Sequence, residues 1–359
     1  MPVELVSAEQ AMASMGNANH YSCIIDARSE DEFALDHLPQ AQNWPSLSNE
    51  ERVRVGTLYK QVGAFEANKL GAALVAANIA KHIETRVMDL PKNWRPLVYC
   101  WRGGKRSGSL ALVLGQIGFK VSVIEGGYKA FRAAVVQHTS QLVLGLHFKV
   151  ITGPTGSGKT RLLHALAAQG AQVLDLEALA VHRSSVLGRI PGQAQPSQKH
   201  FDMRVWNALR QLDANKVVYV EAESKKVGNV SVPDSLIETM RASECIDLSL
   251  QLPERVALLM EDYAFFAQDP ALFCDRLQTL VQACGKPTIA QWQQMVHAGK
   301  TQEVVEALLQ QHYDPTYARS VERNFRRWPQ AHSAYLKDRH PHSLQDLAQQ
   351  LIQTHHIPA

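Results

Sequence analysis

The sequence lacks long apolar runs, paired cysteines and a marked net charge. No apolar stretch reaches about 18 residues, so we expect no membrane-spanning segment. The cysteines are odd in number and lack the spacing of a metal site, which disfavours a disulfide framework. They are Cys23, Cys100, Cys245, Cys274 and Cys284. The first ten residues hold no basic side chain, unlike a signal peptide. We therefore expect a reduced, cytoplasmic protein with no membrane partner.

The overall composition is that of an ordinary globular protein. The chain has 359 residues, of which 45% are hydrophobic and 20% charged, and a formal net charge of +3. This length predicts two or three domains. So small a net charge does not indicate a nucleic-acid partner, so such a partner has to be argued from local clusters of charge.

The stretch GPTGSGKT, from Gly153 to Thr160, has the spacing of a phosphate-binding P-loop. It follows an apolar, β-branched segment, HFKVIT, and precedes a helical pattern that ends at Gly170. Glycines let successive N–H groups turn inward, and the helix N-terminus favours an anion. The alternative is a glycine-rich turn before an ordinary helix. The phosphate-binding candidates are Gly153, Gly156, Ser157, Gly158, Lys159 and Thr160.

Two acidic residues follow predicted strands of the same domain. Asp175 ends the segment QVLD and Glu221 ends KVVYVE. A carboxylate at such a position commonly holds magnesium or orients a nucleophile beside the phosphates. The alternative is that these acids cap the following helices or pair with Lys225 and Lys226.

Cys100 lies in a second loop that could bind an anion, within the first 140 residues. Strands and helices alternate there, which predicts a parallel sheet with its site at the carboxyl ends of the strands. Cys100 ends the strand LVYC and is followed by two glycines and by Lys105 and Arg106. A helix N-terminus and nearby cations lower a thiol's pKa, and the thiolate is the nucleophile. We predict Cys100 and Arg106 as catalytic residues; the alternative is an inert, buried core cysteine.

The last hundred residues predict helices with a basic face. Apolar residues recur three and four positions apart from about Leu252 onward. Four arginines, expected on one helix face near Tyr317, Phe325 and Trp328, suit RNA because cations bind phosphates and rings stack on bases. A solvated helix face is the alternative. The arginines are Arg319, Arg323, Arg326 and Arg327.

The predicted fold class is α/β with three parts. We expect an N-terminal rhodanese-like α/β domain over residues 1–140, a P-loop NTPase-like α/β domain over 145–255 and a helical region over 256–359. The first assignment is based on IIDARSEDEF, DHLPQAQNWP, YCWRGGKRSGSLA and VIEGGYKAFR, which resemble a rhodanese domain. Followed by GPTGSGKT, VLDLEALAVHRSSVLG, QPSQKHFD and VEAESKKVGNV, the arrangement resembles the bacterial tRNA 2-selenouridine synthase family.

That resemblance implies a transferase that modifies the wobble uridine of tRNA. The family geranylates the sulfur of 2-thiouridine with geranyl diphosphate and then exchanges the geranylated sulfur for selenium from selenophosphate. By the resemblance, Cys100 is catalytic in selenation, and selenium could rest on its sulfur. The implied partners are a tRNA carrying 2-thiouridine and selenophosphate synthetase, which supplies selenophosphate. We expect no tightly bound cofactor and no dedicated metal site, with magnesium as an optional companion of the diphosphate.

Two other functions fit the residues. One is a P-loop kinase or NTPase with a regulatory rhodanese-like domain. The other is a sulfurtransferase or a phosphatase that uses Cys100, because Cys100 and Arg106 have the five-residue separation of Cys-dependent phosphatases. A sulfurtransferase alone would not need a P-loop, and no base-recognition region of a kinase is identifiable.

Overall fold

The computed structural model describes residues 3–17, 19–183, 188–190 and 192–354. The chain divides into two compact units. The first comprises residues 1–138 and 196–207, and the second comprises residues 139–195 and 208–359. The division after residue 138 falls inside helix α6 (Gly127–Leu144). Residues 196–207, which the sequence placed in the P-loop domain, belong to the first unit.

The first unit contains the predicted parallel sheet, with strand order β1-β5-β4-β2-β3 and every pair parallel. β4 is therefore the central strand, and Cys100 follows it directly. The strands are β1 (Val3–Val6), β2 (Cys23–Asp26), β3 (Ala41–Asn43), β4 (Pro96–Tyr99) and β5 (Val121–Ile124). The helices are α1 (Ala8–Ser14), α2 (Glu30–Leu35), α3 (Asn49–Gln61), α4 (Ala64–Arg86), α5 (Lys105–Ile117), α6 and most of α9 (Gln198–Leu209).

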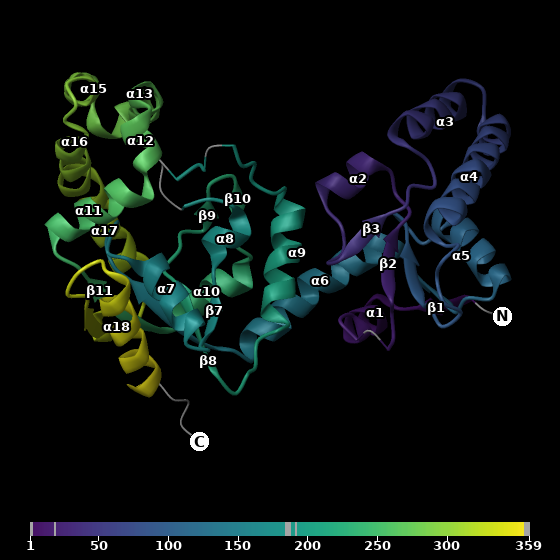
Figure 1. The fold of residues 1–359 in the computed structure, drawn as a ribbon, viewed down its shortest axis with the longest axis horizontal. Coiled ribbons are helices and arrows are strands. Elements are labelled where there is room, and N and C mark those ends of the chain that lie inside the picture. Colours follow the sequence, from purple (N-terminus) through teal and green to yellow (C-terminus); the bar gives the residue numbers. More distant parts are fainter. Residues whose placement is uncertain (1–2, 18, 184–187, 191, 355–359) are drawn as a thin grey trace. The chain divides into compact units, whose positions relative to one another are not determined.

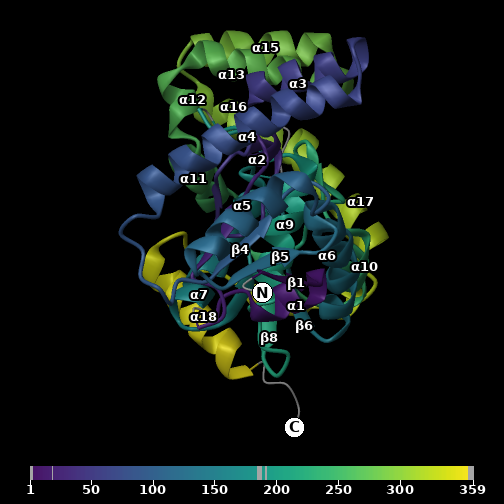
Figure 2. The ribbon, with the colours of Figure 1, turned by 90° about the vertical axis from the view of Figure 1, so that its right-hand side faces the viewer.

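Local sequence signals explain several helix ends in this unit. Ser7 and Gln10 form the capping box that begins α1. Between β3 and β4 the chain forms two helices, α3 and α4, which lie side by side (Figure 2). Gly63 separates them with φ +140°, a backbone angle that L side chains rarely adopt. Among the described residues, no helix combines the length and apolarity needed to cross a bilayer.

The start of α9 joins the first unit through its own side chains. Trp206 is fully buried, packs edge-on against Phe131 and donates from Nε1 to His138 Nδ1 at 3.2 Å. Asp202 forms an ion pair with Arg132. Burial of a whole indole and a paired carboxylate explains why this segment packs with α6.

The second unit contains another five-stranded parallel sheet, in the order β12-β11-β6-β8-β7. The central strand, β6, leads into the P-loop. The strands are β6 (His147–Thr152), β7 (Gln172–Leu174), β8 (Val217–Glu221), β11 (Glu244–Ser249) and β12 (His332–Tyr335), with a small antiparallel pair of β9 (Lys226–Val227) and β10 (Val230–Ser231). Its flanking helices are α7 (Lys159–Ala168), α8 (Leu176–Ala180), α10 (Asp234–Ala242) and α18 (Pro341–Thr354).

A group of helices is inserted between β11 and β12. Its own apolar core includes Phe273, Leu277 and Trp292, and α13 and α15 pack side by side within it (Figure 2). The helices are α11 (Leu252–Asp262), α12 (Ala264–Gln268), α13 (Pro270–Gln278), α14 (Val281–Cys284), α15 (Lys286–His297), α16 (Thr301–Leu308), the π-helix η1 (Leu309–Tyr313), α17 (Asp314–Asn324) and the short 3₁₀-helix η2 (Trp328–Gln330).

The region 256–359 is therefore not purely helical, contrary to the sequence-based expectation. β12 adds an edge strand to the P-loop sheet, paired with β11. α18 then covers α7 and places Leu344, Leu347 and Leu351 in the same core as Leu163 (Figure 1). Local periodicity predicts the helices but not the strand β12. This strand has only four residues, and its partner β11 is distant in sequence.

Candidate functional site

The P-loop has the geometry that its glycines predict. Gly153 has φ +146°, and a Cβ there would lie 2.4 Å from the carbonyl oxygen of Leu248 and 2.6 Å from Ser157 Oγ. Any other residue would therefore clash with backbone. α7 begins at Lys159, so the helix N-terminus lies at the end of the loop, as the sequence predicted.

Lys159 lies across the loop. Its Nζ donates to the carbonyl oxygens of Gly153 at 2.8 Å and Pro154 at 3.4 Å. The N–H of Gly153 donates to the hydroxyl of Tyr317 at 2.5 Å, and Lys159 Nζ lies 5.7 Å from the centre of the Tyr317 ring. Tyr317 therefore occupies a hydrogen-bonding position that an anion's oxygen could take. We expected this ring among the RNA-binding aromatics, and the structure places its hydroxyl against the P-loop.

A polar pocket of about 530 Å³ surrounds the loop. Lys159 and Thr160 line it from the P-loop side, and Glu221 lines it from the end of β8. Arg183 also lines it, donates to the carbonyl oxygen of Asp262 and lies over the ring of Tyr263. The structure thus brings Lys159, Thr160, Glu221 and Arg183 together in one pocket.

Three carboxylates gather in this pocket. One carboxylate oxygen from each of Glu177, Glu221 and Glu223 lies within 4.8 Å of the others. Glu221 is only 5% exposed, and its Oε1 has no hydrogen-bond partner. Burial raises the pKa of Glu221, and the charge of Lys159 and a hydrogen bond from Thr160 oppose this effect. Clustered carboxylate oxygens beside a Thr hydroxyl are the donor set that magnesium prefers.

Asp175 has a different role from the predicted acid. Its side chain accepts from the N–H of Ala178 at 2.8 Å and caps α8. It also lies 2.9 Å from His164 Nε2. The capping alternative therefore describes Asp175, and the clustered acids are Glu177, Glu221 and Glu223. Sequence pattern alone could not separate acids at neighbouring positions after the same strand.

Cys100 lies between β4 and α5, in a ring of hydrogen-bond donors. The hydroxyl of Ser107 donates to its Sγ at 3.1 Å. Burial raises the pKa of the thiol, but the Ser107 hydroxyl and the N–H groups of Ser107, Gly104 and Arg102 outweigh burial, so the pKa lies below its ordinary value. The next loop approaches closely: a Cβ on Gly127, at φ +60°, would lie 2.2 Å from the carbonyl oxygen of Cys100.

The other cysteines contrast with Cys100. Burial raises the pKa of Cys23 and of Cys245 to about 11 in each case. Burial also raises the pKa of Cys274 and of Cys284. Cys100 is itself buried, as the core-cysteine alternative supposed, yet it alone among the five has a lowered pKa.

Arg106 is paired with an acid. Its Nη1 donates to Glu32 Oε2 at 2.7 Å. Burial raises the pKa of Glu32, but hydrogen bonding and charge from Arg106 hold it below its ordinary value. The structure therefore does not show Arg106 bonded to the sulfur, and an incoming anion has to share its guanidinium with Glu32.

The predicted arginine face is only half formed. α17 ends at Asn324, so it carries Arg319 and Arg323, while Arg326 and Arg327 lie beyond it. All four side chains are exposed, and Arg327 pairs with Glu244 at 3.0 Å. Phe325 is 4% exposed and is unsuited to stacking on a base. The expected single helical face of four arginines with aromatics is therefore wrong.

Arg255 is a further site residue that the sequence did not reveal. It is 6% exposed, and its Nε and Nη2 donate to the carbonyl oxygen of Thr155 at 2.9 and 2.7 Å. It also pairs with Asp314 at 2.6 Å. Arg255 thus fixes the P-loop to α11 and α17. The available signal was one arginine within the apolar pattern LPERVALLMED.

Comparison with known proteins agrees with this architecture. Residues 7–134 match the family described as the rhodanese-like domain, and residues 146–273 match the tRNA 2-selenouridine synthase AAA domain. The chain is 40% identical over 244 residues to a tRNA 2-selenouridine synthase of Nitrosomonas europaea. That match covers 67% of this chain and 63% of the relative, so it spans less than two thirds of the relative's length.

Longer matches cover most of both proteins. The chain is 32% identical over 326 residues to a tRNA 2-selenouridine synthase of Alcanivorax borkumensis, covering 82% of this chain and 88% of the relative. It is 30% identical over 350 residues to a protein of the same name from Bdellovibrio bacteriovorus, covering 84% and 89%. The chain therefore belongs to the tRNA 2-selenouridine synthase family.

Proposed function

We propose that this protein is a transferase that converts 2-thiouridine at the wobble position of tRNA into 2-selenouridine. The observation that carries this proposal is the presence of two anion cradles with different chemistry in one chain. The P-loop pocket holds a lysine and clustered acids and has no nucleophilic sulfur. The loop after β4 holds a cysteine with a lowered pKa. One reaction needs a diphosphate leaving group, and the other needs a soft nucleophile.

In the first reaction, geranyl diphosphate alkylates the thiouridine. The thiocarbonyl sulfur forms a bond to C1 of the geranyl group, the C1–O bond breaks and diphosphate leaves with the electron pair. The base loses its N3 proton to water. Lys159 and the loop N–H groups stabilise the negative charge that develops on diphosphate.

Magnesium fits the same pocket. Thr160, Glu177 and Glu221 would hold it, because the buried Glu221 Oε1 lacks a protein partner and Thr160 Oγ1 lies 3.4 Å from Glu177 Oε2. When bound, the ion supplies positive charge for the diphosphate leaving group.

In the second reaction, selenium from selenophosphate replaces the geranylated sulfur. The thiolate of Cys100 attacks phosphorus, the P–Se bond breaks and hydrogen selenide leaves with the electron pair. Hydrogen selenide then attacks C2 of the base, the C2–S bond breaks and geranylthiol departs with the proton. Water hydrolyses the phosphocysteine to phosphate. The N–H groups of Arg102 and Gly104, which lie beside the Cys100 sulfur, would bind the phosphoryl oxygens, and Arg106 would bind them while it also pairs with Glu32.

The macromolecular substrate is a tRNA that carries 2-thiouridine, with selenophosphate delivered by selenophosphate synthetase. Arg319 and Arg323, exposed and four residues apart on α17, offer two phosphate contacts. The same helix presents Tyr317 to the P-loop, which links an RNA-facing surface to the diphosphate pocket.

Reconstitution tests this proposal. The purified chain is given a 2-thiouridine RNA with geranyl diphosphate, and selenophosphate is added afterwards. Mass spectrometry of digested nucleosides should show S-geranyl-2-thiouridine first and 2-selenouridine after selenophosphate. Formation of neither product by folded protein with magnesium present would overturn the function. ATP-dependent phosphorylation of the RNA instead would favour the kinase alternative.

A further inference from the structure

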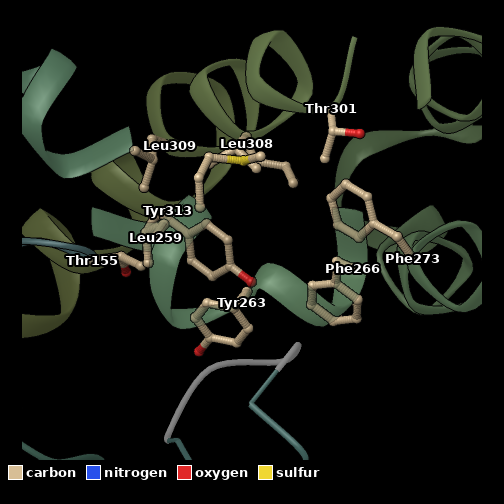
Figure 3. A pocket seen from close by; sticks show the side chains of 11 residues that line it. Thr155, Leu259, Tyr263, Phe266, Phe273, Thr301, Leu308, Leu309 and Tyr313 are labelled. Carbon is tan, nitrogen blue, oxygen red and sulfur yellow. The ribbon is translucent and has the colours of Figure 1, made fainter. Parts of the chain in front are cut away.

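The two cradles differ in what surrounds them. Beside the P-loop lies an apolar pocket, and Figure 3 shows the rings of Phe266 and Phe273 among the side chains that line it. The cysteine loop has charged surroundings instead, because Arg102 and Lys105 are exposed. The aromatic side chain of this loop is Trp101, which is half-buried and directly follows the nucleophilic cysteine. The cysteine loop therefore offers a ring and positive charges at the protein surface.

Trp101 rests on a second ring that is itself fixed. Its indole stacks on Tyr128, with ring centres 5.3 Å apart and 26° between the two planes. Tyr128 is only 2% exposed, and its hydroxyl donates to Asp36 Oδ2 at 2.6 Å. The guanidinium group of Arg28 lies 4.1 Å from the centre of the Tyr128 ring. Because the indole is already ordered by these contacts, a ligand that stacks on it loses little affinity to ordering the protein.

The backbone fixes the indole and the sulfur relative to each other. The N–H of Tyr128 donates to the carbonyl oxygen of Cys100 at 2.8 Å, and the N–H of Lys129 donates to the carbonyl oxygen of Trp101 at 3.1 Å. The sulfur and the indole belong to adjacent residues, whose Cα atoms are about 3.8 Å apart. A planar ligand stacked on Trp101 would therefore be held next to the nucleophile.

Lys199 makes the contact with Trp101 that a ligand can displace. Its Nζ lies 5.8 Å from the centre of the Trp101 ring. Lys199 is exposed near the start of α9, and the next residue anchors this helix because His200 Nδ1 lies 3.2 Å from Asp36 Oδ1. A contact between a lysine and a ring is weak where water reaches it. The ammonium group can therefore leave the ring and bind a phosphate while its helix stays in place.

An aromatic ring with cations beside it suits an unpaired nucleobase. Every base has a face that stacks on an aromatic side chain, and cations bind the phosphates next to that base. The exposed cations in or against this loop include Arg102, Lys129 and Lys199. An apolar chain would gain nothing from these charges, and a small oxyanion would not use the ring. A nucleotide of single-stranded RNA uses both.

We propose that Trp101 is the stacking platform for the wobble base during selenation, and that Lys199 binds a phosphate beside that base. The inference rests on the proposed function, because it takes the modified uridine of that reaction as the occupant. It adds the place where the base is held while its C2 is attacked. It also assigns recognition of the base to the residue next to the nucleophile.

Binding of two matched RNAs to the full-length protein tests the platform. One labelled anticodon stem-loop carries S-geranyl-2-thiouridine at the wobble position, and the other is abasic there. Fluorescence anisotropy compares the wild type with Trp101→Leu and Trp101→Phe. Trp101→Leu should weaken binding of the base-containing RNA by roughly tenfold, the scale of one base stacked on an aromatic ring, and Trp101→Phe should restore most of this loss.

The abasic RNA separates stacking from a structural role. It should bind the wild type and both Trp101 variants alike, because it has no base to stack. Equal weakening of both RNAs by Trp101→Leu is the result of a purely structural role and would overturn the platform. Unchanged binding of the base-containing RNA by Trp101→Leu would overturn it as well.

The cation is tested by a second pair of variants. Lys199→Gln should weaken both RNAs several-fold and lower the slope of log affinity against log salt by about 0.7, for one lost phosphate contact. The matched control is Lys120→Gln, which should leave the slope unchanged. Lys120 is also exposed, but it precedes β5, whereas the platform follows β4 at the opposite edge of the parallel sheet. A wild-type slope in Lys199→Gln would overturn the role of Lys199.

Product analysis separates this inference from the proposed function. With selenophosphate present, Trp101→Leu should lower 2-selenouridine formation mainly through a higher KM for the geranylated RNA. Base-dependent binding that requires Trp101, without any modified product from the wild type, would retain the platform and overturn the function. Selenation by the wild type, together with equal effects of Trp101→Leu on both RNAs, would retain the function and overturn the platform.

Discussion

The two anion cradles of this chain share one plan and differ in how their cations are held. Each follows the central strand of a five-stranded parallel sheet and precedes a helix. In the P-loop, the ammonium group of Lys159 rests on neutral carbonyl oxygens. In the cysteine loop, the guanidinium group of Arg106 rests on the carboxylate of Glu32.

This difference predicts different behaviour toward anions. Lys159 can turn to a phosphate without breaking an ion pair among the described residues, because its hydrogen bonds go to carbonyl oxygens, although its charge also acts on the buried Glu221. Arg106 must loosen an ion pair that is partly shielded from water, which costs more than breaking an exposed one. The cysteine loop therefore depends mainly on its N–H groups and on the Ser107 hydroxyl for holding negative charge.

Loss of the sulfur is the strongest test of this division. Cys100→Ser should lower selenouridine formation by roughly three orders of magnitude or more, since a hydroxyl in this loop stays protonated and covalent nucleophiles are not replaceable. Geranylation should continue, so S-geranyl-2-thiouridine should accumulate. Nucleoside mass spectrometry measures both. Selenouridine formation at the wild-type rate would show that selenation does not need Cys100. Loss of both products by folded protein would show that the two sites depend on each other.

The reciprocal change addresses the P-loop. Lys159→Ala should weaken geranyl diphosphate binding by roughly ten- to a hundredfold, the scale of a charge-assisted hydrogen bond. Selenation of an RNA that already carries the geranyl group should persist. Calorimetry with circular dichroism as a folding control measures the first effect. Normal geranylation by this variant would contradict a role for the P-loop lysine.

The donors around Cys100 predict a pH effect. Because their hydrogen bonds lower the pKa of the thiol, Cys100 should be alkylated by iodoacetamide at a lower pH than the other four cysteines, whose pKa values burial raises. Ser107→Ala removes a donor to the thiolate, so the alkylation profile should move to higher pH and labelling near neutrality should become several-fold slower.

Peptide mass spectrometry across a pH series assigns the labelled cysteine. Thr139→Ala, which removes a buried hydroxyl from α6 rather than from α5, serves as the control and should leave the profile in place. An unmoved profile in Ser107→Ala would mean that the Ser107 hydroxyl does not tune the thiolate.

The smallest expected effect concerns the RNA, which is the substrate of both proposed reactions. Replacing Arg319 and Arg323 with Gln should weaken tRNA binding and lower the slope of log affinity against log salt by about 1.5, for two lost phosphate contacts. Replacing Arg327 with Gln should matter less, because its charge is paired with Glu244. Filter binding over a salt series measures the slopes. Equal slopes in the wild type and the variants would mean that the arginines of α17 form an ordinary solvated helix face.

Sequence reasoning succeeded where structure is decided locally. The P-loop, the strand before it and the loop around Cys100 depend on residues within about ten positions of one another, so spacing and glycine pattern suffice. It failed where partners are distant. The pairing of Arg106 with Glu32, the contact of Tyr317 with Gly153 and the anchoring of Thr155 by Arg255 span 74, 164 and 100 residues.

The acids show an intermediate case. Pattern placed carboxylates at the ends of β7 and β8, but backbone direction decided that Asp175 caps a helix while Glu177 faces the pocket. Helix periodicity likewise predicted α17 but not its end at Asn324, and so it overestimated the arginine face.

The return of the chain to the P-loop sheet sets an order of events during synthesis. A ribosome releases the P-loop, with β6 and α7, long before β12 and α18 exist, because the inserted helices come between. Until α18 emerges, the apolar surface of Leu163 and its neighbours lacks the leucines that cover it in the finished core. Nascent chains therefore expose this apolar surface for an interval during which a chaperone can bind it. If a ribosome stalls within the inserted helices, the surface stays exposed and proteases can recognise the product.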